Sequence, residues 1–308
     1  MTPPDARVIA VIPVFSAPPE LAERVRGLLG QVERVVLVDD GTFSLGGTEL
    51  DGLDRVDVVE LDENRGIAHA LNVGVGVARE AGADAVLTLD QDSAAPDGYV
   101  ADAMAAIAAD RGRGRNPGFA VPASAGGNAI LRTRSRRGGT AEAFDPIQSG
   151  AVVPIEVFDE LGGFAEQLFI DAVDSDFTLR ALRAGYSIAV VEGADIGHSL
   201  GELVPIMIAG RHLTVGGKPR HVLYHAPFRT YYMVRNSIYL MQEHRKGFLR
   251  WHAVRWFKMG SMIVALIVLG DGRMPQLRAV RYGARDGFRR RFGRIPPETL
   301  AKITGGRR

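Results

Sequence analysis

Short, almost unbroken apolar runs alternate with longer helix-like stretches through the first 110 residues of the chain. The strand-like runs are Arg7–Val14, Val35–Val38, Val56–Leu61 and Ala85–Leu89. The helix-like stretches that follow or separate them are Pro19–Gly30, Gly66–Glu80 and Pro96–Ala109. Strands that read as continuous apolar runs are buried on both faces, and strands alternating with helices imply a mainly parallel sheet flanked by helices. We therefore predict an α/β fold.

The pattern changes after residue 110. Residues 111–139 are rich in Gly and Arg, and two short β-like pieces there predict loops and edge strands: Gly118–Pro122 and Asn128–Thr133. Apolar content returns at Ile147–Ile155, followed by a predicted helix at Ser175–Gly185 and a strand at Ser187–Val191. Three helical stretches then follow His225: Tyr231–His244, Phe248–Leu269 and Pro275–Phe292. We expect a catalytic domain over residues 1–225 and a basic helical region over 226–308.

Composition and charge narrow the choice further. With 308 residues, 46% of them hydrophobic, the chain can bury a full core. It has no cysteine, which excludes disulfides, zinc-thiolate sites and thiol nucleophiles. The N-terminal residues lack the basic and apolar regions of a cleaved signal peptide, so we expect a cytoplasmic protein.

The net charge of +1 hides a strong asymmetry. Residues 245–308 contain 16 Lys and Arg against three acidic residues, a net charge of +13, and the preceding 244 residues carry −12. Such a basic tail predicts an anionic partner, and a solvated helical face is the alternative.

Two carboxylates directly follow the strand-like run that ends at Leu89. Asp90 and Asp92 flank Gln91, and the end of a parallel strand is the edge at which α/β sheets bind ligands. Mg²⁺ and Mn²⁺ take one or two carboxylates and complete their coordination with phosphate oxygens and water. The triplet therefore predicts a divalent metal shared with a diphosphate, although a solvated acidic turn would look the same.

Two more polar clusters fall at predicted strand and helix ends. Asp39 and Asp40 precede Gly41 at the end of the second strand, where a carboxylate can accept from a nucleobase or a ribose; a tight turn is the alternative. Asn64 can cap the following helix, and Arg65, before Gly66, can meet a phosphate or a base.

Taken together and in this order, four segments resemble the nucleotide-sugar-binding half of glycosyltransferase family 2, whose members are inverting and have the GT-A fold. The segments are Ile12-Pro13-Val14-Phe15, Val38-Asp39-Asp40-Gly41, Asn64-Arg65-Gly66 with Asn72, and Asp90-Gln91-Asp92. The resemblance implies that Asp39 contacts the nucleobase, Asp90 lies near the ribose, and Asp92 binds the metal. The donor-binding residues that it implies are Pro13, Phe15, Asp39, Asp40, Asn64, Arg65, Gly66, Asp90, Gln91 and Asp92.

The resemblance continues through Ser149-Gly150, Leu161-Gly162-Gly163-Phe164-Ala165-Glu166 and the segment from Leu168 to Arg180. Many relatives have Glu-Asp-x-Asp-x-x-x-Arg in that last segment, with the second acid as catalytic base. Val173 replaces the Glu here, so the resemblance implies that Asp174 is the base, with Asp171 as a substitute one turn earlier. An acidic cap of the following helix is the alternative. In addition, His198 follows a strand where the family often has a histidine that closes the metal site.

Residues 225–236, His-Ala-Pro-Phe-Arg-Thr-Tyr-Tyr-Met-Val-Arg-Asn, resemble a segment of bacterial rhamnosyltransferases within the family. The acceptor-binding residues implied are Ser149, Gly150, Arg229, Tyr231, Arg235 and Asn236. The expected reaction moves L-rhamnose from dTDP-rhamnose to a glycan or polyprenyl-linked acceptor in cell-surface polysaccharide synthesis. A UDP-sugar (galactofuranosyl or hexosyl) transferase is the alternative, and a sugar-phosphate nucleotidyltransferase is a more distant one.

Motifs of rival chemistries are missing. The sequence has no G-x-x-x-x-G-K-[ST] phosphate loop and no G-x-S-x-G serine-hydrolase motif. The glycines at 74 and 76 begin like a dinucleotide fingerprint, but Arg79 replaces the third glycine and the stretch lies inside a predicted helix. We expect no nucleic-acid partner.

The basic tail holds an apolar stretch of about 12 residues, Met259–Gly270, which is too short for a bilayer that takes ~20. Trp251 and Trp256 precede it among Arg250, Arg255 and Lys258, a mixture typical of a helix lying at a membrane surface. The cluster Arg285–Arg294 would add attraction to anionic lipid. We therefore expect a peripheral protein on the inner face of the membrane; packing on the catalytic domain or in a homodimer is the alternative.

Overall fold

A computed structural model describes residues 6–130, 132–134, 141–197, 203–205, 207–208, 211–212, 214–215, 218–219, 221–223, 225–269 and 272–305. By packing, the chain divides into two compact units. The first comprises residues 1–166 and 173–199, and the second comprises residues 167–172 and 200–308. The short segment 167–172 therefore packs with the C-terminal unit although both of its sequence neighbours belong to the first. The boundary predicted at 225/226 stays a prediction.

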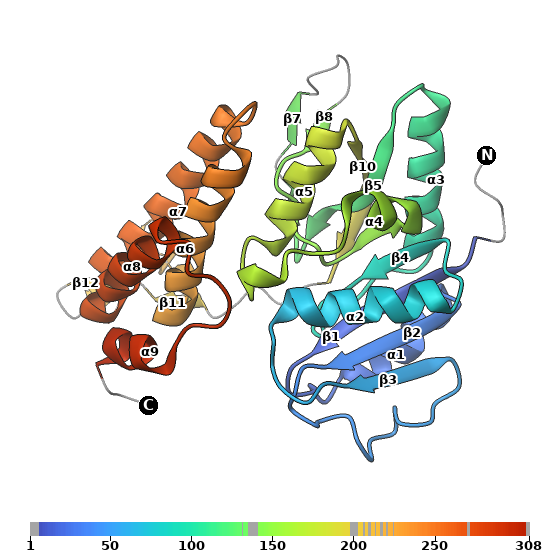
Figure 1. Ribbon diagram of the computed structural model, residues 1–308, viewed down its shortest axis with the longest axis horizontal. Coiled ribbons are helices and arrows are strands. Elements are labelled where there is room, and N and C mark those ends of the chain that lie inside the picture. Colours follow the sequence, from blue (N-terminus) through green and yellow to red (C-terminus); the bar gives the residue numbers. More distant parts are fainter. Residues whose placement is uncertain are drawn as a thin grey trace. The chain divides into compact units, whose positions relative to one another are not determined.

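The described part of the first unit contains an eight-stranded mixed sheet (Figure 1). Its strands are β1 (Val8–Val14), β2 (Arg34–Asp39), β3 (Val56–Glu60), β4 (Ala85–Thr88), β5 (Pro117–Ala125), β6 (Asn128–Ala129), β9 (Ala151–Pro154) and β10 (Ser187–Ile196). The order is β10-β5-β9-β4-β1-β2-β3, with β6 paired to β5. Strands β3, β2, β1 and β4 are parallel, and β9 runs antiparallel between β4 and β5. The predicted α/β class is confirmed.

Helices cover both faces of this sheet because successive side chains of a buried strand point to opposite sides. Ala10 and Ile12 of β1 join a core with α1 (Leu21–Leu28) and α3 (Tyr99–Gly112). Between them, Val11 lies against α2 (Ile67–Glu80), where a Cβ at Gly74 would come within 2.2 Å of a Val11 methyl group. The remaining helices of this unit are α4 (Ile155–Leu161) and α5 (Val173–Ala184), and a 3₁₀ turn, η1 (Glu166–Leu168), begins in it.

Strand β5 differs from its prediction as a short edge strand. It runs for nine residues, lies between β10 and β9, and buries Phe119 and Val121. Its one glycine, Gly118, is explained by close packing, because a Cβ there would lie 2.9 Å from the Tyr186 side chain. The strands β7 (Arg132–Arg134) and β8 (Ala141–Ala143) form a separate hairpin.

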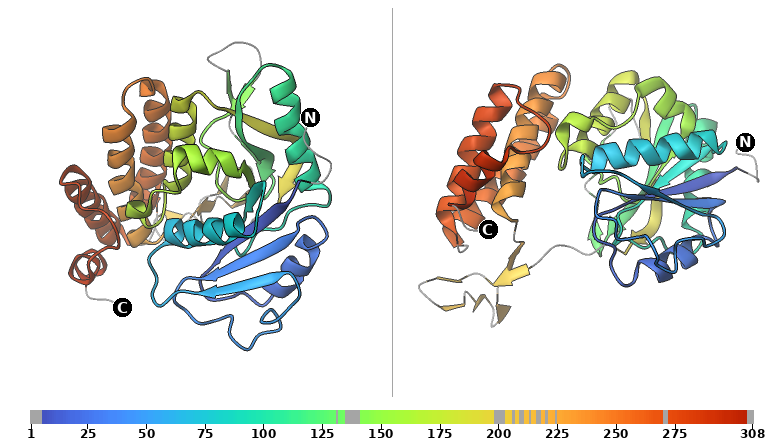
Figure 2. Two further views of the ribbon diagram at one scale, coloured as in Figure 1. Left: turned by 45° about the vertical axis from the view of Figure 1, so that its right-hand side comes forward. Right: turned by 60° about the horizontal axis from the view of Figure 1, so that its bottom comes forward.

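The described part of the second unit contains, besides residues 167–172, the helices α6 (Pro227–His244), α7 (Leu249–Leu269), α8 (Arg273–Phe288) and α9 (Pro297–Thr304), with two-stranded ribbons before α6. The ribbons pair β11 (Leu203–Pro205) with β16 (His221–Leu223), β12 (Met207–Ile208) with β13 (Arg211–His212), and β14 (Thr214–Val215) with β15 (Lys218–Pro219). The orange and red helices α6, α7 and α8 lie side by side (Figure 2). Gly283 and Gly287 let α8 approach α6, since a Cβ at Gly283 would lie 2.5 Å from the Tyr231 carbonyl oxygen.

One part of the membrane prediction is wrong. Trp251 is only 6% exposed and packs edge-on against His252, and Trp256 packs on the cluster that contains Val234 and Ile238. Trp251 is therefore part of the helical core and does not face outward, and Trp256 is partly buried, because one side of α7 packs in the core. Among the described residues, no helix is both long and apolar enough to cross a membrane.

Candidate active site

The loops that follow β1, β2 and β4 lie at one edge of the sheet, because these three strands are parallel. Pro13 is buried in β1 opposite Val38, and Val14 pairs with Asp39 at the end of β2. The predicted donor-binding residues of these loops are thus brought together at the carboxyl edge. This is the edge at which ligands bind in such sheets.

The middle residue of the Asp-Gln-Asp turn ties two of these loops together. Gln91 Oε1 accepts from the backbone N–H of Phe15 over 2.7 Å, and its Nε2 donates to the Phe15 carbonyl over 3.1 Å. From α1, Arg24 donates to the Gln91 carbonyl over 3.0 Å. The backbone of the loop after β1 is therefore held, and the Phe15 ring is left 56% exposed. That ring is available to a ligand.

Asp39 is fully buried and organises its own loop. Its two carboxylate oxygens accept from the backbone N–H groups of Thr42, Phe43 and Ser44 and from the hydroxyls of Thr42 and Ser44, over 2.6–3.0 Å. Burial alone would raise the pKa of Asp39, but these hydrogen bonds outweigh it and lower the pKa. All five donors come from the loop itself. The observed contacts are therefore those of the alternative given above, an Asp that forms a tight turn.

The same network reaches the neighbouring loop. Ser16 N–H donates to the Thr42 hydroxyl over 3.2 Å, and Ala17 N–H donates to the Ser44 hydroxyl over 3.0 Å. Asp39 therefore fixes two loops at the sheet edge through Thr42 and Ser44. It also holds Phe43, whose φ of 51° is in the left-handed region and whose ring is 59% exposed.

Asp40 joins the β2 loop to the start of α2. Its Oδ1 accepts from the Arg65 N–H over 3.0 Å; burial raises the pKa of Asp40, against the effect of the Arg65 and Gly66 N–H groups. The predicted helix cap is wrong: α2 begins after Gly66, and Asn64 accepts from the Gly66 N–H over 3.1 Å, before the helix starts. The Arg65 side chain is exposed at this edge.

Gly41 explains why these loops can meet. Its φ is +74°, and a Cβ there would lie 2.5 Å from the backbone of Glu63 and Asn64. The Asp-Asp-Gly loop can therefore pack directly on the segment that carries Arg65.

Two residues of the loop before β9, Gln148 and Ser149, hydrogen bond to Asp90. Its carboxylate accepts from the Gln148 amide, and its N–H donates to the Ser149 hydroxyl over 3.0 Å. Ser149 is fully buried and donates to Ser93, and Gly150 donates its N–H to the Thr88 carbonyl over 2.7 Å. Ser149 and Gly150, predicted as acceptor-binding residues, thus support the Asp90 turn in this structure.

Hard oxygen donors for a metal are present at the same turn. The carboxylate of Asp92, partly exposed, and the neighbouring Asp90 match the one or two carboxylates that Mg²⁺ or Mn²⁺ takes beside phosphate oxygens. No group of three or more potential ligand side chains is found among the described residues. The predicted ligand His198 lies outside these residues. The donor set fits a metal that relies on the substrate for the rest of its coordination.

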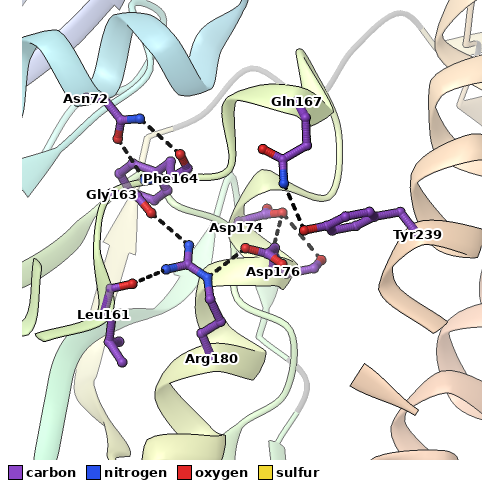
Figure 3. Close-up of polar contacts among 10 residues, drawn as sticks. Asn72, Leu161, Gly163, Phe164, Gln167, Asp174, Asp176, Arg180 and Tyr239 are labelled. Atoms are coloured by element: carbon purple, nitrogen blue, oxygen red, sulfur yellow. Dashed lines mark hydrogen bonds and ion pairs between the residues drawn. The ribbon is translucent and has the colours of Figure 1, made fainter. Parts of the chain in front are cut away.

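The Asp174 region is anchored within the first unit by two long side chains (Figure 3). Arg180 donates to Asp176 over 2.8 Å and to the carbonyls of Leu161 and Gly163, both over 2.8 Å. From α2, Asn72 accepts from the Phe164 N–H over 2.7 Å and donates to its carbonyl over 2.9 Å. The turn that follows α4 is therefore fixed from two sides, by Arg180 of α5 and by Asn72 of α2.

Asp174 and Asp176 have different environments on α5. Asp176 is 1% exposed and paired with Arg180, whereas Asp174 is partly exposed in the first turn. Asp174 Oδ1 accepts from the Ser175 N–H over 2.7 Å, and the Ser175 hydroxyl donates to Asp145 over 2.5 Å. Of the two, Asp174 is the acid that solvent, and hence a substrate, can reach.

In the second unit, α6 contacts the segment 167–172. Arg229 Nη2 donates to Asp171 over 2.6 Å, and the Asn236 amide donates to the carbonyls of Ile170 and Asp171, both over 2.8 Å. Arg235 is 1% exposed and Asn236 is fully buried. Tyr231, also 1% exposed, donates to Asp286 over 3.0 Å. These four predicted acceptor residues, Arg229, Tyr231, Arg235 and Asn236, make internal contacts in this structure.

Sequence reasoning missed several residues at these sites. Phe43 and Gln148 carry no pattern that marks them, because their positions follow from loop packing. The sequence predicts no role for His69, yet its Nδ1 lies 3.0 Å from Glu166 Oε2. Burial alone would raise the pKa of Glu166, but hydrogen bonds from Asn72 and His69 lower it. The only sequence signal for this cluster was the spacing of Asn72 in the family pattern.

The Asp-x-Asp turn at the sheet edge and the partly exposed Asp174 on α5 are features from which the resemblance implied a GT-A glycosyltransferase. Residues 9–145 match the family model of glycosyl transferase family 2. This match confirms the resemblance seen in the sequence. Among curated proteins, the chain is 26% identical over 263 residues to the dTDP-rhamnosyl transferase RfbF of Shigella flexneri, covering 78% of this chain and 81% of that protein.

Solved structures show the same fold. The S. aureus TarS 1–349 crystal structure matches with a TM-score of 0.57 at 15% identity, covering 91% of this chain and 80% of TarS 1–349. Its complex with UDP matches with a TM-score of 0.52 at 14% identity, covering 97% and 90%. At these identities the likeness extends to the fold alone. It confirms the predicted GT-A type.

Proposed function

We propose that this protein is an inverting rhamnosyltransferase that moves L-rhamnose from dTDP-rhamnose to a hydroxyl group of a glycan or lipid-linked acceptor in cell-surface polysaccharide synthesis. The similarity to a dTDP-rhamnosyl transferase over 78% of the chain carries the choice of sugar. The site supports the chemistry, because exposed aromatic, cationic and acidic side chains meet at the carboxyl edge of the sheet. A UDP-sugar transferase of the same fold is the alternative.

The donor is held in this proposal by the loops after β1, β2 and β4. The exposed rings of Phe15 and Phe43 offer apolar faces to the nucleobase, and the exposed Arg65 meets a phosphate. Asp39 acts indirectly, since its own loop occupies its oxygens. Asp92 and Asp90 would hold a divalent cation, which when bound would neutralise charge on the leaving diphosphate.

Asp174 is the catalytic base in this proposal. An inverting transfer needs a base to take the proton of the attacking hydroxyl and a fixed in-line arrangement of the two substrates. Asp174 is partly exposed, whereas the alternative, Asp171, is paired with Arg229 and only 13% of its side chain is exposed. An acid already paired with a guanidinium is less accessible to a substrate hydroxyl.

The acceptor is presented at a membrane in this proposal, on the cytoplasmic face. One stripe of α7 is exposed although its residues are apolar: Leu249 is 69%, Phe257 77%, Val264 58% and Val268 54% exposed. We call these four residues the α7 ridge; at 3.6 residues per turn they fall on one side of the helix. The net charge of +13 in residues 245–308 disfavours pairing of two copies through this unit and favours an anionic surface.

A panel of radiolabelled nucleotide sugars, assayed with and without EDTA, tests the function. Transfer from dTDP-rhamnose to a lipid-linked glycan, lost with EDTA and restored by Mn²⁺, is the expected result. Transfer only from UDP-sugars would support the alternative donor. Release of pyrophosphate from dTTP and a sugar phosphate would identify a nucleotidyltransferase and reject the proposal.

A further inference from the structure

The segment 167–172 has an unusual backbone. Phe169, Asp171 and Ala172 have φ values of 65°, 62° and 67°, so three of four consecutive non-glycine residues adopt the left-handed conformation. That conformation costs L-residues about 1–2 kcal/mol each. The segment therefore needs outside support to keep its shape. It ends directly before Val173, the first residue of α5, and Asp174 is the second residue of that helix.

The support comes from one face of α6. Arg229, Tyr232, Asn236 and Tyr239 recur every three or four residues, the spacing of one helix face. The Tyr232 ring stacks on Phe169 with centroids 5.4 Å apart, and the Tyr239 hydroxyl accepts from the Gln167 amide over 2.9 Å. All of these contacts lie within the second unit.

Asn236 is the centre of this contact. Its amide nitrogen reaches three backbone carbonyls, those of Leu168 over 3.0 Å, Ile170 over 2.8 Å and Asp171 over 2.8 Å. Leu168 and Ile170 each neighbour a residue in the left-handed conformation, and Asp171 is itself in that conformation. A single side chain thus fixes the curled backbone.

The orientation of the amide is dictated by its neighbours. Arg235 Nε can only donate, and it does so to Asn236 Oδ1 over 2.9 Å. The three carbonyls can only accept, so they require the NH₂ group on the other side. Arg235 is itself fixed by donation to the carbonyls of Leu168 and Gly293 and by the ring of Tyr232, 4.7 Å from its guanidinium carbon. A carboxylate at 236 would face three oxygens.

We propose that Asn236 is a positioning residue: its amide holds residues 168–172 in the left-handed path that sets the start of α5 and hence the place of Asp174. The inference rests on the proposed role of Asp174 as base. It replaces the predicted contact of Asn236 and Arg235 with the acceptor. Both side chains are buried and their polar atoms are directed at the protein itself.

The first test compares Asn236→Ala and Asn236→Asp with Ser237→Ala. Ser237 is buried on the same helix and donates to the Met259 sulfur, so its loss controls for damage to α6 alone. We expect kcat to fall about 10²-fold in both Asn236 variants with donor and acceptor KM unchanged, because a displacement of ~1 Å costs that much. Ser237→Ala should keep the wild-type kcat.

The second test is rescue. Glycine adopts positive φ without penalty, so Ala172→Gly should recover kcat about tenfold in the Asn236→Ala background, measured relative to Ala172→Gly alone. Ala165→Gly, at a nearby loop position outside the left-handed set, should recover nothing. Rescue by both glycines, or by neither, would overturn the proposal.

Hydrogen exchange separates this inference from the function itself. Asn236→Ala should speed amide exchange in residues 168–172, and Ser237→Ala should not. If Asp174→Asn were active but the exchange result held, the base assignment would fail while the positioning of the segment stood. Unchanged exchange with a raised acceptor KM would show that Asn236 contacts the acceptor. If Asn236→Ala does not fold, Asn236→Ser, which keeps one donor, takes its place in the same measurements, and the same outcomes support or overturn the proposal.

Discussion

Arg229 binds Asp171 through two nitrogen atoms, with Nη2 2.6 Å from Oδ1 and Nε 3.4 Å from Oδ2. This pair gives the two acids considered for the catalytic base different surroundings. It ties Asp171 to α6, whereas Asp174, three residues later, lies in the first turn of α5. Asp171 thus anchors this region to α6, and the proposed catalytic role falls to a different carboxylate, Asp174.

Asp174→Asn is expected to keep donor affinity and to lower kcat by about 10²- to 10⁴-fold, because the amide has the shape of the acid but cannot take the proton. Asp171→Asn, which can still hydrogen bond to Arg229, should lose far less. Steady-state kinetics and donor titration check both. An inactive Asp171→Asn beside an active Asp174→Asn would assign the base to Asp171.

Asp92→Ala is expected to remove metal-dependent donor binding, because the cation loses its direct carboxylate while the diphosphate remains. Calorimetry with the nucleoside diphosphate should show at least about tenfold weaker binding with Mn²⁺ present, and no gain from Mn²⁺. Asp57→Ala is the matched control, since Asp57, which lies on β3, forms a surface pair with Arg34. Wild-type, Mn²⁺-enhanced affinity in Asp92→Ala would reject the metal assignment.

Asp39→Asn is expected to lower the free energy of unfolding at pH 7 by about 2 kcal/mol or more, because an amide cannot accept all of the loop donors that the carboxylate satisfies. The folded pKa of Asp39 lies below its ordinary value of 3.8, so its stabilisation is present above that pH and is lost as pH falls through the folded pKa. Urea unfolding of both proteins should therefore show a difference that narrows below pH 3.8. A constant difference would contradict the prediction.

Phe257→Glu is expected to abolish co-sedimentation with anionic vesicles at low salt, since it places a charge in the middle of the α7 ridge. Phe43→Glu makes the same chemical change in the first unit and should leave sedimentation unchanged. Binding of the wild type should weaken with salt and with neutral lipid, because basic residues contribute ~1 kcal/mol each near an anionic leaflet. No wild-type sedimentation at low salt, with dimers in solution, would favour the ridge as a subunit contact.

The sequence predicted the sheet edge well because the signals there are local. Apolar runs followed at once by Asp39, Asp90 or Asp92 mark the ends of parallel strands, and strand ends of one sheet meet in space. The pattern also located α5 and three of the four C-terminal helices. Helix α9, with eight residues, is too short to give a reliable periodicity.

The roles of buried polar residues could not be read in the same way. The resemblance of residues 225–236 to a rhamnosyltransferase segment implied that Arg235 and Asn236 bind the acceptor, and charged and amide side chains are seldom fully buried. Their partners lie about 65 residues earlier, at the carbonyls of 168–171, and no local pattern records such a pairing. Similarly, nothing in the sequence of Trp251 and Trp256 shows which side of α7 faces the helical core.

The path of the chain between its two units has a consequence for engineering. It leaves the first unit after Glu166, returns at Val173 and leaves again after residue 199. The C-terminal unit therefore cannot be exchanged by joining two chains at a single position. A chimera that exchanges the C-terminal unit would have to import residues 167–172 together with 200–308 from the same parent. If residues 167–172 stayed behind, they would meet a foreign α6 and lose their contacts with Asn236.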